Sequence, residues 1–224
     1  MMYPVGFFKP PTAAPPSGIT LGRSNSAVIA GTNTSCTIGW ASGGAAASGT
    51  WLVAVCRNNT GNSFNITGGS AWTEIGTSNI FYKQCGPSEP TTYSCQYSGS
   101  NKDEAQSITI LEVIGASSVE ASSSAAATNT PPSRTSTDAG DLAVIAGGLA
   151  DFLVDLTITP PAGYTTASKH DKSNDVSLYT SNACTIIATK SSVGTGTIAP
   201  GAFVCTTSSS HSTLQQVATL LFKP

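Results

Sequence analysis

The chain has 224 residues, enough for one sandwich- or barrel-sized domain with a sizeable core. Only 10% of the residues are charged, and Lys, Glu, Gln and Leu are scarce beside Gly, Ser, Thr and Ala. This composition indicates an all-β protein whose solvent faces carry hydroxyls instead of charges. The net charge of -2 leaves no basic surface for phosphates, which argues against nucleic-acid binding.

No apolar run approaches the length of a membrane span, so we expect no contact with a membrane. The first eleven residues have neither the basic region nor the continuous apolar region of a Sec signal. No local pattern in the chain indicates a cofactor.

Residues 1–24 are predicted to form an extended arm. Five prolines exclude a helix or a central strand there: Pro4, Pro10, Pro11, Pro15 and Pro16. Tyr3, Phe7 and Phe8 are costly to leave in water, so we expect the arm to lie on its own domain or on a neighbouring subunit. These three aromatic residues make the arm the candidate assembly element.

Residues 25–224 are predicted to form a single β-sandwich domain, with one half at 25–116, a crossover at 117–140 and a second half at 141–224. Short apolar runs separated by Gly, Pro, Asn and Ser predict twelve strands. The first six are Ala27–Ala30, Cys36–Trp40, Trp51–Arg57, Asn79–Lys83, Thr91–Tyr97 and Ser107–Ile114. The crossover is low in hydrophobic residues and is expected to lie on the surface. Alternatively, part of it around Thr128 pairs as a short edge strand.

The second half is predicted to repeat the strand order of the first. Its strands are expected at Asp141–Ala146, Leu153–Thr157, Val176–Thr180, Cys184–Ala188, Phe203–Thr206 and Val217–Phe222. The repeat places Trp72 opposite Tyr164 and Tyr82 opposite Tyr179. We therefore expect an antiparallel two-sheet sandwich of jelly-roll type with an internal duplication.

The six cysteines form no metal-binding spacing such as CxxC. In the preferred interpretation, Cys85 with Cys95 and Cys184 with Cys205 lie on neighbouring strands at matching places in the two halves and form disulfides. In the alternative, all six are small buried hydrophobic residues.

Polar clusters give weak indications of chemistry. His170 and His211 stand beside Ser residues, and Asp171 follows His170, but Ser is so abundant that such neighbours arise by chance. Asp171 and Asp175 could offer oxygen ligands to calcium, although a solvated turn is the simpler interpretation. We therefore predict no catalytic and no metal-binding residue, and expect Trp72 and Tyr164 to pack or, if exposed, to stack on a sugar.

Several motifs resemble two-module β-sandwich proteins encoded among the structural genes of tailed bacteriophages. The first half carries the resemblance through Trp51–Val55, Ser70–Thr73 and Phe81–Tyr93, the last with the step Glu89-Pro90-Thr91-Thr92-Tyr93. The second half carries it through Gly140–Val144 and Thr159–Thr165 but lacks the Glu-Pro-Thr-Thr-Tyr step.

The resemblance implies a non-enzymatic virion protein, either a capsid decoration or cement protein or a tail or fibre component. Such a protein assembles in the host cytoplasm, functions extracellularly, and binds other virion proteins and copies of itself as a homo-oligomer. The alternative function is recognition, in which the sandwich presents its loops to a host glycan. Loops of Ser, Thr and Gly favour the structural role.

Overall fold

The computed structural model is all-β, and every strand pairing in it is antiparallel. The structure describes residues 18–29, 35–40, 42–58, 64–98, 106–121, 127–151, 156–171, 182–207 and 214–224. No helix long and apolar enough to cross a membrane is found in these segments. The predicted all-β class is confirmed.

The first half forms two sheets. The first large sheet has five strands in the order β1 (Thr20–Ile29), β8 (Gln106–Ile114), β3 (Trp51–Asn58), β6 (Ile80–Gln84) and β5 (Thr73–Glu74). The small sheet has three strands in the order β2 (Ser35–Gly39), β7 (Thr92–Tyr97) and β4 (Phe64–Thr67).

The second half forms a second large sheet and two strand pairs. The large sheet has the order β13 (Thr165–His170), β14 (Asn182–Val193), β11 (Asp141–Asp151), β17 (Gln216–Lys223) and β9 (Ser118–Ala121). The pairs are β12 (Leu156–Thr159) with β16 (Val204–Thr207), and β10 (Arg134–Ser136) with β15 (Gly196–Ile198).

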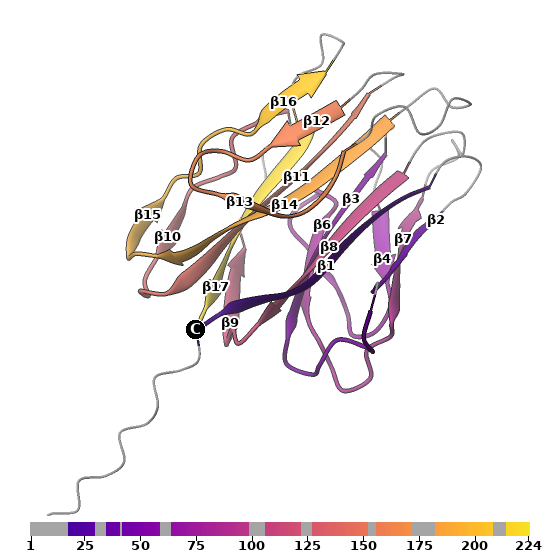
Figure 1. Cartoon of the computed structure of the whole chain (residues 1–224), viewed down its shortest axis with the longest axis horizontal. Helices are drawn as coiled ribbons and strands as arrows, with labels where there is room; N and C mark the ends of the chain where they lie inside the picture. Colours follow the sequence, from indigo (N-terminus) through magenta and orange to yellow (C-terminus); the bar gives the residue numbers. More distant parts are fainter. Residues whose placement is uncertain are drawn as a thin grey trace, which may run out of the picture.

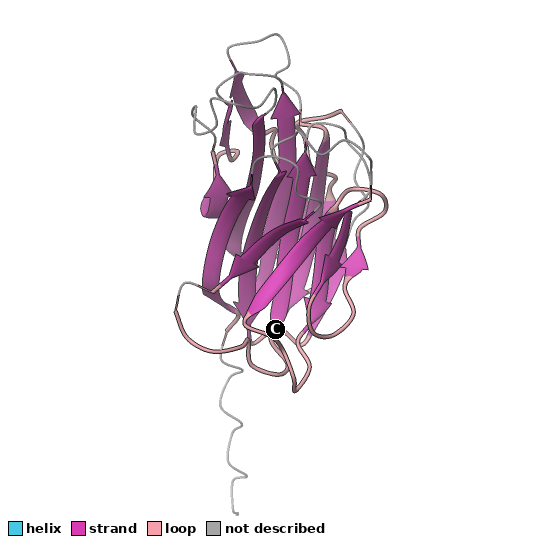
Figure 2. Ribbon diagram, turned by 90° about the vertical axis from the view of Figure 1, so that its right-hand side faces the viewer, coloured by secondary structure: helices cyan, strands magenta, loops and turns pink. Residues whose placement is uncertain are grey.

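The sheets stack in four layers, which Figure 1 shows edge-on from the small sheet to the two strand pairs. One apolar core lies between the small sheet and the first large sheet, a second between the two large sheets, and a third under β12 and β16. The view turned by 90° shows the strands of the stacked sheets running in a similar direction, as in aligned sheet packing (Figure 2).

The stack has more layers than the two sheets predicted from the sequence, and strand β3 explains why. Alternate residues of a strand point to opposite faces, and in β3 both sets are apolar. Leu52 and Ala54 pack in the core against the small sheet, whereas Val53 and Val55 pack in the core between the large sheets. A strand with two apolar faces needs a covering layer on each side.

The structure corrects the end of the predicted arm and the outline of the crossover. β1 begins at Thr20, before residue 24, because residues 17–24 contain no proline and Ile19 already packs against the core between the large sheets. The crossover contains β9 and β10 instead of an edge strand at Thr128. Tyr3, Phe7, Phe8 and the predicted strand Val176–Thr180 lie outside the described residues.

The cysteine pairing differs from the preferred interpretation. Cys95 on β7 is bonded to Cys56 on β3, with 6.3 Å between their Cα atoms. Cys85, Cys184 and Cys205 are reduced thiols, as is Cys36. Cys56 and Cys95 both belong to the core shared by the first large sheet and the small sheet. The bond therefore joins these two sheets across that core.

We predict that the Cys56–Cys95 bond stabilises the fold strongly. It spans 39 residues, and closing a loop of that size contributes about 4 kcal/mol in the chain-entropy model. Replacing both cysteines with Ala should lower the free energy of unfolding in urea by roughly this amount. Cys36→Ala is the matched control, since it removes a buried thiol from the same core without breaking a bond. Equal losses in the two variants would contradict the prediction.

We also predict that the two halves fold as one cooperative unit. The core between the large sheets takes Val53, Val55 and Leu111 from one half and Leu142 and Phe222 from the other. Each half expressed alone would expose that face to water, so both should be insoluble or unfolded. Two soluble halves, each with its own cooperative melting transition by calorimetry, would show that the prediction is wrong.

Candidate functional site

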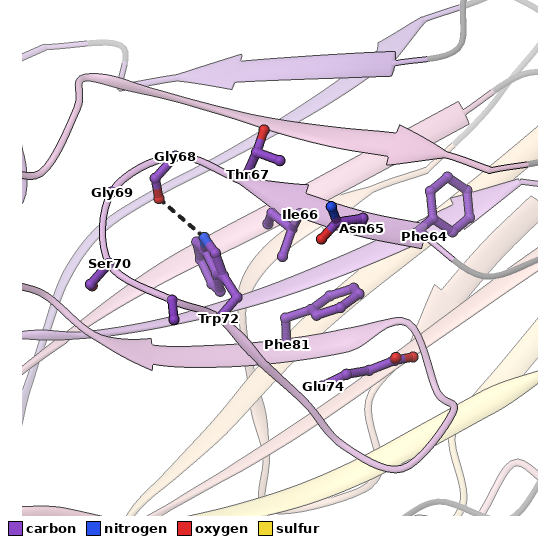
Figure 3. Close-up of a pocket in the computed structure, with 11 residues that line it drawn as sticks. Phe64, Asn65, Ile66, Thr67, Gly68, Gly69, Ser70, Trp72, Glu74 and Phe81 are labelled. Carbon is purple, nitrogen blue, oxygen red and sulfur yellow. Dashed lines mark hydrogen bonds between the residues drawn. The ribbon is translucent and has the colours of Figure 1, made fainter.

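A hollow opens at one edge of the first half, between the edge strand β4 and the loop that leads into β5 (Figure 3). Its volume is about 510 Å³, within the range of roughly 300–1,000 Å³ usual for small-ligand pockets. It is lined by Phe64, Asn65, Ile66, Thr67, Gly68, Gly69, Ser70, Ala71, Trp72, Glu74 and Phe81.

The loop Gly68–Trp72 forms the wall opposite β4, and two glycines allow its turn. Gly68 and Gly69 have positive φ angles of 116° and 73°, where side chains are strained. A Cβ on Gly69 would also clash with Glu89 and Lys83. At the end of the loop, Trp72 Nε1 donates a hydrogen bond to the Gly68 carbonyl oxygen (3.3 Å, dashed in Figure 3), which closes the turn.

A buried ion pair lies behind this loop. Lys83 belongs to β6, where alternation turns it toward the core shared with the small sheet, and its side chain is 0% exposed. Its Nζ lies 2.5 Å from Glu89 Oε2 and donates to the Gly68 carbonyl oxygen at 2.7 Å. Because a buried ammonium group needs a counter-charge and acceptors, Lys83 fixes both Glu89 and the loop.

Both carboxylate oxygens of Glu89 also accept hydrogen bonds. Its Oε1 accepts hydrogen bonds from Ser70 N (3.1 Å), Ser70 Oγ (2.7 Å) and Gly86 N (3.0 Å), and its Oε2 also accepts from Tyr93 OH (3.2 Å). Burial alone would raise the pKa of Glu89, but the bonds from Lys83, Ser70 and Gly86 outweigh it and lower the pKa to about 2. The carboxylate is therefore charged throughout the physiological range.

The ion pair also holds Trp72 in place. Lys83 Nζ lies 4.7 Å from the ring centroid of Trp72 and 4.7 Å from that of Tyr93. The two rings meet edge to face with their centroids 5.6 Å apart. Trp72 is half-buried and lines the hollow, so its indole is a rigid part of the wall.

Asn79 fixes the other end of the hollow. Its backbone N–H donates to Glu74 Oε1 (2.8 Å), and its Oδ1 accepts from Phe64 N (3.0 Å). Its Nδ2 donates to Gln216 Oε1 on β17 (3.2 Å). Through its backbone and side chain, Asn79 thus connects the small sheet, the β5–β6 hairpin of the first large sheet and the second large sheet.

The hollow combines a closed apolar floor with open polar groups. Phe64, Ile66 and Phe81 are each only 4–5% exposed, whereas Asn65 is exposed and Thr67 and Glu74 are partly exposed. Glu74 is the only described lining residue with a formal charge. Behind the loop, the charges of Lys83 and Glu89 neutralise each other. The site offers hydrogen-bonding groups and an aromatic ring, with a weakly negative field.

The polar candidates from the sequence do not assemble into a reactive site. Ser168 Oγ donates to the Asn25 carbonyl oxygen (3.1 Å), and Asp171 pairs with Lys169 and accepts from Ile158 N (3.3 Å). His211 and Asp175 lie outside the described residues. Within the segments that the structure describes, no three His, Cys, Asp or Glu side chains are placed to hold a metal ion.

The thiols of Cys36, Cys85 and Cys205 are poor nucleophiles. Burial raises the pKa of Cys36 to about 12 and that of Cys205 to about 11, and it also raises the pKa of Cys85. These thiols are protonated at neutral pH, and the thiolate is the reactive form.

The two aromatic residues matched by the repeat have different surroundings. Trp72 lines the hollow, whereas Tyr164 is half-buried against the cores of the second half, with Lys190 Nζ 6.0 Å from its ring centroid. Tyr179 lies outside the described residues. Of Trp72 and Tyr164, only Trp72 therefore lines this hollow, whose described lining also includes exposed polar side chains.

Sequence reasoning missed the strand that forms the hollow. Phe64-Asn65-Ile66-Thr67 alternates apolar and polar residues, which is the period of a half-buried strand, but it is only four residues long. Lys83, Glu89 and Tyr93 belonged to the motif that carried the family resemblance, without any role assigned to them.

Comparison with known proteins finds no match to a family model, to a curated protein or to a solved structure.

We predict that Glu89→Gln destabilises the fold and that the effect depends on pH. At neutral pH the variant leaves Lys83 buried without its counter-charge, which costs about 3–5 kcal/mol. Because the folded-state pKa of Glu89 is lowered, its stabilising effect is present above the ordinary value near 4.5 and is lost as the pH falls toward 2.

The difference in unfolding free energy between wild type and Glu89→Gln should therefore shrink from pH 6 to pH 2, as followed by urea titration. Glu74→Gln is the control for the loss of one carboxylate at the same edge. A difference that stays constant with pH would contradict the role assigned to the ion pair.

Proposed function

We propose that the chain is a non-enzymatic structural protein of a tailed-bacteriophage particle, either a head decoration protein or a tail component. It binds neighbouring virion proteins and copies of itself. The observation that carries this proposal is the face-to-face packing of two large sheets, which makes one rigid block from both halves. The phage-like motifs fall within that block, where Lys83, Glu89 and Tyr93 support its architecture.

An internal duplication accounts for the pairing plan of the two large sheets. β8, β3 and β6 are neighbours in the first sheet, as β17, β11 and β14 are in the second, with β1 and β9 at corresponding edges. The small pairs β4–β7 and β12–β16 correspond in the same way. β3 faces β11 at the centre, while β1 lies over β13 and β8 over β14.

The chemistry of the block suits a particle that functions outside the cell. Buried carboxylates are paired with buried lysines, as in Lys83–Glu89 and in Lys223–Asp141 (2.9 Å). The disulfide is typical of proteins that work in an oxidising environment. Hydroxyl-rich surfaces with 10% charged residues favour packing against like copies over binding to a charged polymer.

The arm is the element that we assign to assembly, and deleting residues 1–17 tests it. The deletion stops before Gly18 because Ile19 and β1 belong to the folded body. Tyr3, Phe7 and Phe8 each gain on the order of 1.5–3 kcal/mol when fully buried, and several arms per assembly multiply that gain. The truncated protein should keep its melting temperature and lose its place in the oligomer or particle, measured by sedimentation and by mass spectrometry of purified particles.

Replacing Phe7 and Phe8 with Ser should weaken assembly to a similar extent. Val204→Ser is the matched control, because Val204 is 59% exposed on β16, within the body. If the truncated protein assembles with unchanged occupancy, the contacts lie on the faces of the sheets instead.

A further inference from the structure

We propose that the hollow beside β4 binds a neutral saccharide, with Trp72 as the stacking surface and Asn65, Thr67 and Glu74 as the hydrogen-bonding groups. This inference goes beyond the structural role and does not depend on it. A sugar ring presents an apolar C–H face and a rim of hydroxyls, and the hollow offers partners for both.

Trp72 has the rigidity that stacking requires. Lys83 covers one side of the indole, Tyr93 meets it edge to face, and the indole N–H is engaged by the Gly68 carbonyl oxygen. The ring therefore loses little conformational freedom when a ligand arrives, which favours binding. Its remaining exposed part faces the hollow.

The polar groups are placed to receive hydroxyls. Asn65 is exposed on the edge strand and offers both a donor and an acceptor. Glu74 uses Oε1 to accept from Asn79 N, which orients the carboxylate and leaves Oε2 as an acceptor. Thr67 Oγ1 donates to the Ser94 carbonyl oxygen (3.4 Å) and keeps its own acceptor capacity. Figure 3 shows these residues along the hollow between β4 and the strand that carries Phe81.

Two observations select a neutral sugar over other ligands. The apolar floor of Phe64, Ile66 and Phe81 is already 95% or more covered, so it gives little surface to anchor an apolar peptide. Glu74 is the one uncompensated charge among the described lining residues, so a sialic acid, a uronic acid or a phosphate would be repelled.

The chain offers a matched control in its second half. Thr157 is exposed on β12, which pairs with β16 as β4 pairs with β7, and it is followed by a buried Ile as Asn65 is. Thr157→Ala changes one exposed polar residue on a small strand and leaves the hollow intact.

The experiment is titration of the ¹⁵N-labelled full chain with the methyl glycosides of glucose, galactose, mannose and N-acetylglucosamine, followed by NMR. At least one glycoside should shift the indole N–H signal of Trp72 and the side-chain amide of Asn65, while the indole signals of Trp40 and Trp51 stay in place. Asn65→Ala should weaken that binding by about tenfold with an unchanged melting temperature. Trp72→Phe should also weaken it, and Thr157→Ala should leave it unchanged.

The proposal is overturned if no glycoside shifts either signal, or if binding survives both Asn65→Ala and Trp72→Phe. It is likewise overturned if glucuronate binds more tightly than glucose, or if a peptide of residues 1–17 is the only ligand that shifts Trp72. The last result would identify the hollow as a docking site for the arm.

Discussion

Each large sheet is covered on both faces, and this double burial determines the architecture. β3 and β11 lie at the centre of their sheets, and apolar residues fill both of their faces. A strand of this kind is stable only between two layers, so the two large sheets cover each other and each needs a further outer layer. The small sheet and the strand pairs β12–β16 and β10–β15 provide these outer layers.

Such an apolar body restricts where charges can be placed. In the first half, Lys83 and Glu89 satisfy each other and fix the loop beside Trp72. In the second, Asp141 accepts from Lys223 Nζ (2.9 Å) and Ser136 Oγ (2.7 Å), which joins β11, β17 and β10. Buried pairs of this type add little net stability but penalise any arrangement that separates them. Their effect is to specify how loops and edge strands close over the cores.

The long apolar strands could be predicted from the sequence because burial on both faces leaves a continuous run, as in Trp51–Arg57, Ser107–Ile114 and Val217–Phe222. Two other strands could not be predicted. Phe64–Thr67 is short and Thr165–His170 is polar, and both depend on neighbouring strands for their pairing. The disulfide prediction was wrong for the same reason, because the pairing also depends on which strands lie side by side. Cys85 is nearer to Cys95 in sequence, but the sandwich brings Cys56 across the core, and only the three-dimensional packing decides between them.

The abundance of Ser and Thr has a structural counterpart at the sheet edges. Ser24 Oγ and Ser26 Oγ donate to the carbonyl oxygens of Ala167 (2.9 Å) and Lys169 (3.0 Å), so hydroxyls tie edge strand β1 to edge strand β13. Between the large sheets, Thr109 and Thr185 share a buried hydrogen bond of 2.6 Å. Free sheet edges are sites of unwanted pairing, and hydroxyls close this one without introducing charge. The opposite edge of the first half, at β4 and β5, ends in the hollow lined by Trp72 and Asn65. The β1 edge is therefore closed by contacts with β13, whereas the edge at β4 and β5 is open to other molecules.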